Sequence, residues 1–549
     1  MGIKKYVANA DTTIVNAYQN NLEIRGTGSN AGEADILEVY SVYGRQSTSS
    51  QELSRVLIKF PITDISTDRT AGDIPASGSV SFYLRMFSAE SSKTVPRDYT
   101  LTFLAVSQSW QEGVGLDLEN YTDLTYGNTG ANWMSASNAA TGYWYDDNGT
   151  LLAGGSYHTG TVNADVDVDI FTFTQDFSTG LEDVEVNITP WVEQWMAGTW
   201  TNYGIGVKLS ASYEAASSSS ADELVSRVPQ TLDAQSPTSA VIYNPSGSTT
   251  SYYTKRMFAR GTEFFFKKPV IEARWNSSRY DDRGSFYYSS SLATGEDNLN
   301  TLYLYNVVRG RLTDIPEIGT TGSIMLSLFS GSANNSAPSG SKLELYDGSN
   351  SSVVTSVSGG WKETGIYTAS LAFTAAATPI KTLYDVWSTG SIIDGDHLKV
   401  QFHTGTITPL TLGSSVVETR PVYYINITNL RDRYRADEVG RFNLYVREKN
   451  WSPTIYTRAS SNIPNTSIRS ASYQIYRLLD AYNAIPYGTG SDLHTGLSYD
   501  VSGNYFDLDM SLLEPGYAYG IKFSFYDSGL ATWREQRQTF KFRVEDYEY

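Results

Sequence analysis

The sequence contains no cysteine and only four histidines among its 549 residues. Without thiols the chain forms no disulfide, holds no metal through thiolates and offers no cysteine nucleophile, so its stability must come from burial or from assembly. It also lacks the roughly 20 consecutive apolar residues of a membrane helix, and its first residues, MGIKKYVANADTTIV, contain no apolar signal-peptide core. We therefore expect a soluble protein that is made in a cytoplasm and has no membrane partner.

Positive charge is scarce as well. The 41 Lys and Arg residues are outnumbered by 59 Asp and Glu residues, which gives a formal net charge of −18. Such an acidic surface repels phosphate backbones and argues against nucleic acid as a partner. Aromatic residues, by contrast, are abundant, with 40 Tyr, 21 Phe and 11 Trp. Tyrosine combines an apolar ring with a hydroxyl group, which suits sheet surfaces and subunit interfaces, so this composition favours strands over helices.

The strongest strand signal is residues 54–61, read as SRVLIKFP, an apolar and β-branched run that ends at a proline. Such a run fits a strand buried in a sandwich core. Because the chain is too long for one core, we predict an all-β protein with three domains. They are a large jelly-roll-like sandwich with long inserted loops over residues 1–275, and two smaller Ig-like β-sandwiches over residues 276–415 and 416–549.

Short runs bounded by Gly, Asn, Ser or Pro predict the strands of each domain. In the first domain they cover residues 11–17, 36–43, 54–61, 79–87, 99–106, 184–188, 204–210, 263–267 and 270–275. In the second domain they cover residues 303–308, 323–329, 342–346, 365–373 and 397–403. In the third they cover residues 423–430, 441–447, 472–478, 505–509, 517–526 and 538–544. In the last of these strands, Phe540, Phe542 and Val544 share one face, and Lys541 and Arg543 share the other.

One helix is predicted, over residues 189–198. Thr189 is its expected N-cap, Pro190 its first helical residue and Gly198 its terminating residue. Two long loops, residues 108–178 and 215–250, interrupt the predicted sandwich. Loops of this length in a compact domain are usually functional or disordered, and the tryptophans of the first loop indicate that it is packed.

Six short landmarks follow one another through the first half of the chain. They are ADTTI at residues 10–14, residues 55–61, SWQEG at residues 109–113, and residues 187–198, 204–207 and 269–275. In order and spacing they resemble the DNRLRE-type β-sandwich. That family is similar to carbohydrate-binding modules and is found on cell-surface and secreted proteins, so the resemblance implies a sandwich of this kind.

Three further segments stand out in the last quarter: WSP at residues 451–453, SYDVSGNYFD at residues 498–507, and the closing residues 540–545. Together with their place after the sandwich half, they resemble the C-terminal domains of structural proteins of large tailed marine bacteriophages. The resemblance implies a virion component that assembles in the host cytoplasm with other virion proteins, as a homo-oligomer or within a symmetric assembly.

Exposed aromatic rings would be the basis of glycan binding, because their faces stack on the apolar faces of sugars. Trp133, Tyr143 and Trp144 in the first long loop are the candidate platform for a host surface glycan. The alternative is that these rings serve packing or subunit contact. Three other tryptophans are expected to anchor the sandwich core instead: Trp110, Trp191 and Trp195.

Calcium is the metal that acidic loops of such sandwiches would bind, because hard oxygen ligands cluster there. The candidate ligands are six residues of the same long loop: Asp146, Asp147, Asn148, Asp165, Asp167 and Asp169. The alternatives are a tight turn for the first three and a solvated sheet face for the alternating acids. No other cofactor is expected.

Catalytic groups are sparse. Asp507 and Asp509, like the acids of residues 165–169, alternate with apolar residues and so lie on one sheet face, whereas glycoside hydrolysis needs two carboxyls facing each other across a sugar. His397 and His403 bracket a predicted strand and would share a face, as a zinc site or as a plain surface pair. No nucleophile motif occurs, so we predict that the protein is not an enzyme.

Together these observations predict a structural component of a tailed-bacteriophage virion. It would decorate the capsid or form part of a neck, tail or fibre, and it would act through protein–protein interfaces. A glycan- or receptor-binding surface module is the first alternative. A polysaccharide depolymerase is the second.

Overall fold

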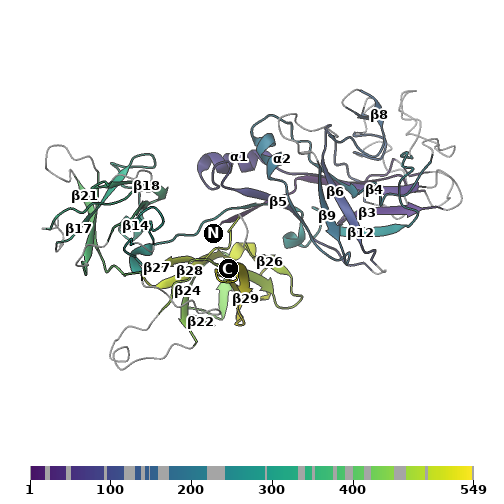
Figure 1. Ribbon diagram of the computed structural model, residues 1–549. Coiled ribbons are helices and arrows are strands. Elements are labelled where there is room, and N and C mark those ends of the chain that lie inside the picture. Colours follow the sequence, from purple (N-terminus) through teal and green to yellow (C-terminus); the bar gives the residue numbers. More distant parts are fainter. Residues whose placement is uncertain are drawn as a thin grey trace. The chain divides into compact units, whose positions relative to one another are not determined.

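The computed structural model describes residues 2–18, 25–26, 28–44, 51–91, 95–116, 130–137, 142–146, 149–158, 172–218, 241–290, 293–331, 340–348, 353–374, 380–389, 400–412, 422–449, 465–488 and 492–546. The chain divides between Trp275 and Asn276 into two compact units, called here the first and the second unit. Strands make up most of the regular structure of both units (Figure 1). The predicted all-β, multi-domain fold is therefore confirmed. The predicted boundary at 415/416 lies outside the described residues.

The first unit is a sandwich of two antiparallel sheets. The smaller sheet has the strand order β1 (Ile3–Val7), β13 (Val270–Arg274), β5 (Ser81–Met86) and β10 (Val184–Asn187). The larger sheet has the order β12 (Tyr252–Phe258), β3 (Ile36–Tyr43), β4 (Gln51–Lys59), β11 (Ile205–Leu209), β6 (Tyr99–Ala105) and β9 (Thr172–Phe177). Strand β2 (Ala10–Val15) joins the larger sheet by pairing with β4.

Strand β4 is buried on both of its faces. Val56 and Ile58 point into the core between the two sheets, where they meet Phe82 of β5. Leu53 and Leu57 point the other way and pack into a second apolar cluster beneath the long loops. Because successive side chains of a strand face opposite sides, a strand covered on both sides buries an unbroken run of residues, here Leu53 to Ile58. The buried strand predicted for residues 54–61 is confirmed.

The predicted helix is present as α2 (Thr189–Met196), with Trp191 and Trp195 buried in the main core as expected. Its cap differs from the prediction by one residue. Ile188 occupies the N-cap position, and the Thr189 hydroxyl instead accepts a hydrogen bond of 2.8 Å from the backbone N–H of Phe82. The hydroxyl therefore ties the helix to the smaller sheet.

A second helix, α1 (Ile62–Ala71), contacts α2 and was not predicted. Its sequence, ITDISTDRTA, consists largely of weak helix formers, and only Ile62 and Ile65 are buried, so no helical period is visible. The ends are nevertheless marked in the sequence. Pro61 precedes the helix, and Gly72 ends it in the left-handed conformation with φ of 84°.

The sequence missed several strands of the first unit. Strands β1, β9 and β12 had no predicted counterpart, and the short hairpin of β7 (Trp144–Tyr145) and β8 (Leu151–Leu152) lies inside the predicted first loop. The strand predicted for residues 263–267 is wrong, because Phe265–Lys267 forms the 3-10 turn η1. The segment holds three consecutive phenylalanines, as a buried strand would, but Phe264 and Phe265 are exposed.

The second unit begins with a sheet in the order β14 (Asn300–Tyr305), β19 (Ile366–Leu371), β18 (Val357–Glu363), β17 (Ile324–Phe329), β20 (Leu383–Ser388) and β21 (Gln401–Ile407). Tyr367 and Trp387 are fully buried in its core. Strands β18 and β20 were not predicted. A separate hairpin pairs β15 (Val307–Val308) with β16 (Arg311–Leu312), and η2 (Asp282–Gly284) precedes the sheet.

The last part of the second unit is a sandwich of two sheets, called here the C-terminal sandwich. One sheet has the order β22 (Tyr423–Ile427), β24 (Val439–Glu448), β28 (Gly503–Asp509) and β27 (Ser498–Asp500). The other has the order β23 (Arg433–Arg435), β31 (Phe540–Glu545), β29 (Ala518–Asp527), β25 (Ala471–Arg477) and β26 (Asn483–Ile485), with β30 (Thr532–Glu535) beside β29 and the turn η3 (Met510–Leu512) after β28. Strand β23 pairs with β31 in parallel.

Aromatic rings fill the core of the C-terminal sandwich. Phe506 lies between Phe442, at 4.9 Å between ring centroids, and Tyr473, at 4.1 Å. In β31, Phe542 and Val544 are buried and Lys541 and Arg543 are exposed, so the predicted two-faced pattern of this strand is confirmed.

Residues 279–283, read as RYDDR, link the two parts of the second unit. Arg283 forms two hydrogen bonds of 2.6 and 2.7 Å to Asp385 in β20. Asp282 accepts hydrogen bonds from Arg469 at 3.0 Å and from the Tyr499 hydroxyl at 2.8 Å, both in the C-terminal sandwich. Opposite charges next to each other in the sequence thus tie one sheet to the next.

Candidate functional site

The three aromatic residues proposed as a sugar platform are buried. Trp133 and Trp144 are completely inaccessible and Tyr143 is 2% exposed. The Trp144 indole donates a hydrogen bond of 2.9 Å to the Asn132 carbonyl, deep beneath the loop layer. A platform for a sugar requires exposed ring faces, so the packing alternative accounts for these three rings.

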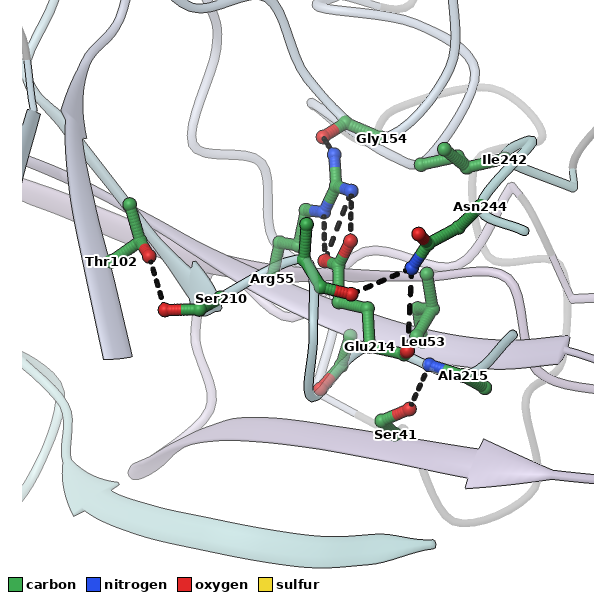
Figure 2. A network of polar contacts seen from close by, with 12 residues as sticks. Ser41, Leu53, Arg55, Thr102, Gly154, Ser210, Glu214, Ala215, Ile242 and Asn244 are labelled. Atoms are coloured by element: carbon green, nitrogen blue, oxygen red, sulfur yellow. Dashed lines mark hydrogen bonds and ion pairs between the residues drawn. The ribbon is translucent and has the colours of Figure 1, made fainter. Parts of the chain in front are cut away.

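Beside Trp133 lies a buried ion pair, which Figure 2 shows with its surroundings. The Arg55 guanidinium donates two hydrogen bonds of 3.0 Å to the Glu214 carboxylate and one of 2.8 Å to the Gly154 carbonyl. Its centre lies 5.3 Å from the centroid of the Trp133 ring. Arg55 comes from β4, whereas Glu214 and Gly154 come from loops, so the pair fastens the loop layer to the larger sheet.

The proposed calcium ligands fall largely outside the described residues. Those are Asp147, Asn148, Asp165, Asp167 and Asp169. Asp146 is described, and its carboxylate accepts a hydrogen bond of 2.7 Å from the Thr150 backbone within a turn that passes through Gly149. Within the described part of the chain no three acidic or histidine side chains are grouped as they would be around a metal ion. The role of the loop acids stays a prediction.

The remaining candidates for chemistry lie on sheet surfaces. Asp507 and Asp509 share the outer face of β28, because Phe506 and Leu508, which alternate with them along the strand, are buried. Asp509 caps the turn η3 by accepting a hydrogen bond of 2.9 Å from the Ser511 backbone. His403 is exposed on β21, and His397 lies outside the described residues.

Two of the sequence landmarks meet at a buried carboxyl that sequence reasoning missed. Asp11, from residues 10–14, is 1% exposed and accepts a hydrogen bond of 2.5 Å from the Arg260 backbone. Glu112, from residues 109–113, accepts a hydrogen bond of 2.9 Å from the Asp11 backbone and two from the Arg260 guanidinium. Burial raises the pKa of Asp11 to about 7, although the bond from the Arg260 backbone opposes this. Among the described residues, Asp11 Oδ1 has no hydrogen-bond partner.

A second buried carboxyl lies among cations on the smaller sheet. Glu272 is 1% exposed and contacts Arg274 at 2.7 Å, Arg85 at 3.2 Å and Lys5 at 3.5 Å. Burial alone would raise the pKa of Glu272, but the three positive charges hold it well below its usual range. Arg274 also pairs with Glu185 at 2.6 Å. The cluster joins strands β1, β13, β5 and β10 side by side.

The C-terminal sandwich carries an open groove of about 990 Å³ on its four-stranded sheet, called here the polar groove. Its lining includes Thr428, Arg441, Asn443, Tyr445, Asp500 and Tyr505. The sequence predictions placed all of these residues except Asp500 in strands and gave none of them a function. The sequence did contain a signal for a polar surface here. Strand β24 reads VGRFNLYVRE, in which buried apolar residues alternate with Arg, Asn and Tyr on the other face.

The first unit exposes two phenylalanines next to two lysines, called here the Phe patch. Phe264 is 48% exposed and Phe265 is 61% exposed. Phe264 packs edge-on against Phe258 at 5.6 Å between ring centroids, and the Lys268 ammonium lies 5.8 Å from the Phe265 ring centroid. Lys267 completes the patch. Aromatic residues are enriched at protein interfaces, so two adjacent exposed phenylalanines are a candidate contact surface.

Comparison with known proteins assigns no family to the chain: no family model matches it, and no curated protein matches it. The DNRLRE-type and bacteriophage resemblances therefore stay predictions. In the part of the chain that the structure describes, no helix is long and apolar enough to cross a membrane.

Proposed function

We propose that this protein is a structural component of a tailed-bacteriophage virion and that it works through protein–protein interfaces. The observation that carries the proposal is the Phe patch. Phe264 and Phe265 are adjacent and 48% and 61% exposed, and aromatic residues are enriched at interaction sites. The bacteriophage resemblance of the last quarter supplies the kind of assembly.

The architecture supports the same proposal. Both units are built from sheets with buried aromatic cores, and the buried ion pairs of the first unit fasten its loops to the sheet. Such a scaffold can hold a surface patch in a fixed position, which lowers the entropic cost of binding a partner. We assign no residue a catalytic role.

The experiment isolates virus particles on a density gradient from the culture that produces the chain and detects the chain in the particle band by mass spectrometry. A Phe264→Ser, Phe265→Ser double variant should lower its incorporation by about tenfold or more, as expected for losing the aromatic anchors of an interface. Leu479→Ser is the matched control, because Leu479 is an exposed turn residue of the second unit, 78% accessible. Absence of the chain from the particle band would refute the proposal.

A depolymerase and a glycan-binding module remain the alternatives. The depolymerase would release reducing ends from host polysaccharide, and Asp507→Asn would abolish that release. The glycan-binding alternative in its original form needs Trp133 and Trp144 at the surface, and both are buried. The polar groove of the C-terminal sandwich offers a better basis for ligand binding.

A further inference from the structure

The polar groove lies on the outer face of the sheet formed by β22, β24, β28 and β27. Phe442, Leu444 and Val446 of β24 point into the aromatic core. The intervening residues must therefore point outward, and among them Arg441, Asn443 and Tyr445 line the groove. Its volume of about 990 Å³ is at the upper end of the range of about 300–1,000 Å³ that is typical of ligand sites.

The groove contains a guanidinium group that is fixed in place but makes few strong hydrogen bonds. The centre of the Arg441 guanidinium lies 3.7 Å from the centroid of the Tyr505 ring, which is a stacking contact. Its two side-chain hydrogen bonds, to Asp500 and to Asn443, are both long at 3.4 Å. A guanidinium has five N–H donors. The ring therefore holds the group in position, and among the described residues no partner other than Asp500 and Asn443 takes its side-chain donors.

The wall beside Arg441 is the turn between β27 and β28. The Asp500 carboxylate accepts a hydrogen bond of 2.7 Å from the Ser502 backbone, which leaves its other oxygen toward Arg441. Asn465 donates a hydrogen bond of 2.6 Å to the Ser502 carbonyl. Gly503 has a φ of 114°, and a Cβ there would lie 2.1 Å from the Asn465 amide nitrogen. Hydrogen bonds within the turn therefore hold this wall in one conformation and position Asp500.

We propose that the polar groove binds a neutral polyhydroxylated ligand of the saccharide class. Arg441 offers donors, Asp500 offers an acceptor, and Asn443 and Thr428 offer both, all on the groove surface. Neighbouring sugar hydroxyls each donate and accept a hydrogen bond, so they match this mixed set. An anion would also attract Arg441, but the carboxylate of Asp500 would repel it. Tyr445 adds an aromatic ring to the lining, as sugar-binding surfaces require.

This inference is independent of the proposed role in a virion, because it rests on residues of the second unit that the Phe patch does not include. It also differs from the glycan site predicted from the sequence, which lay in the first unit. Failure of either proposal therefore leaves the other standing.

The test is isothermal titration of the full chain with two sets of probes. The neutral set is maltohexaose, cellohexaose and mannohexaose, and the acidic set is hexagalacturonate and hexamannuronate. We expect at least one neutral oligosaccharide to bind. Arg441→Gln and Asp500→Asn should each weaken that binding at least about tenfold, because each removes a directed hydrogen bond to the ligand. Asn at position 500 still accepts the bond from Ser502, so the wall should persist.

Arg435→Gln is the matched control, since Arg435 pairs with Asp437 at 2.7 Å on the other sheet of the same sandwich. It should leave binding unchanged. Circular dichroism of each variant reports folding, and Asn443→Ala replaces either groove variant if that variant fails to fold. The inference is overturned if no neutral oligosaccharide binds, if only the acidic probes bind, or if the folded groove variants bind as the unchanged protein does.

Discussion

Two ion pairs, one in the first unit and one in the C-terminal sandwich, lie in opposite environments. In the first unit, the side chains of Arg55 and Glu214 are each only 5% exposed. In the C-terminal sandwich, Arg435 and Asp437 form a pair at 2.7 Å, with side chains 56% and 51% exposed. Breaking the buried pair should cost far more free energy than breaking the exposed pair. A buried charge that loses its partner has no water to solvate it, whereas an exposed charge is already solvated.

The loops explain this difference. In the first unit, Gly154 of the first long loop and Glu214, just before the second, both hold the Arg55 guanidinium (Figure 2). In the C-terminal sandwich, the outer face of the four-stranded sheet is open where the polar groove lies. The Arg55–Glu214 pair therefore fixes the fold, whereas Arg441 in the C-terminal sandwich stays available to a ligand.

The largest expected effect comes from breaking the sealed pair. Glu214→Ala leaves the Arg55 guanidinium buried without its carboxylate, and we expect the free energy of unfolding to fall by about 3–5 kcal/mol. Urea unfolding followed by tryptophan fluorescence measures this change. The double variant Arg55→Met, Glu214→Met should recover most of the loss, because an apolar pair of similar size has no unpaired charge. A loss below about 1 kcal/mol in the single variant would show that the pair behaves as a surface pair.

Glu272→Gln should have the next largest effect, about 2–4 kcal/mol at pH 7, since it leaves Lys5, Arg85 and Arg274 without their central carboxylate. Glu185, which still pairs with Arg274, compensates in part. The pKa of Glu272 is lowered in the folded state, so its contribution is present above its unfolded pKa, near 4.5, and is lost as the pH falls below that value. Unfolding at pH 7 and at pH 3 should therefore show the variant converging on the unchanged protein in acid.

Asp11 should show the opposite dependence on pH. Its pKa rises from 3.8 to about 7 on folding, so the folded state holds a proton that the unfolded state releases between these values. Stability then falls as the pH rises from about 4 to 7, by up to about 1.4 kcal/mol per pH unit. Asp11→Asn should stabilise the protein by about 1–3 kcal/mol at pH 8 and make little difference near pH 4. A variant that is destabilised at pH 8 would show that the ionised form is needed to hold Arg260.

The sequence predicted those parts of the fold in which local pattern and burial agree. Residues 54–61 carried the signature of a strand covered on both faces, and Trp191 with Trp195 carried that of a buried helix face. Helix α1 escaped because only two of its residues are buried. The segment of Phe264 and Phe265 misled the prediction, because apolar residues at an exposed patch look like those of a buried strand.

The candidate sites were harder to predict, because they depend on what covers a residue. Trp133 and Trp144 have the composition of a sugar platform, but whether loop aromatics face water is decided by the layer that folds over them. Asp11 and Glu112 lie about 100 residues apart in the sequence and meet only in the folded sheet. The polar groove was visible as alternation in β24, but its wall comes from a distant turn.

The smallest expected effect on stability is that of replacing an exposed arginine of the C-terminal sandwich, and it tests most directly whether the two regions use their charges differently. Arg435→Gln removes one side of an exposed pair, and we expect an unfolding curve that coincides with that of the unchanged protein within measurement error, because water and salt already screen these charges. Arg441→Gln should be nearly as mild, since the Arg441 side chain is 47% exposed and its bond to Asp500 is long. The two variants should therefore match in urea unfolding and differ only in oligosaccharide binding. If Arg441→Gln instead destabilises the sandwich as strongly as Glu272→Gln destabilises the first unit, then the stacked guanidinium serves to fix the fold, and the two regions use their charges alike.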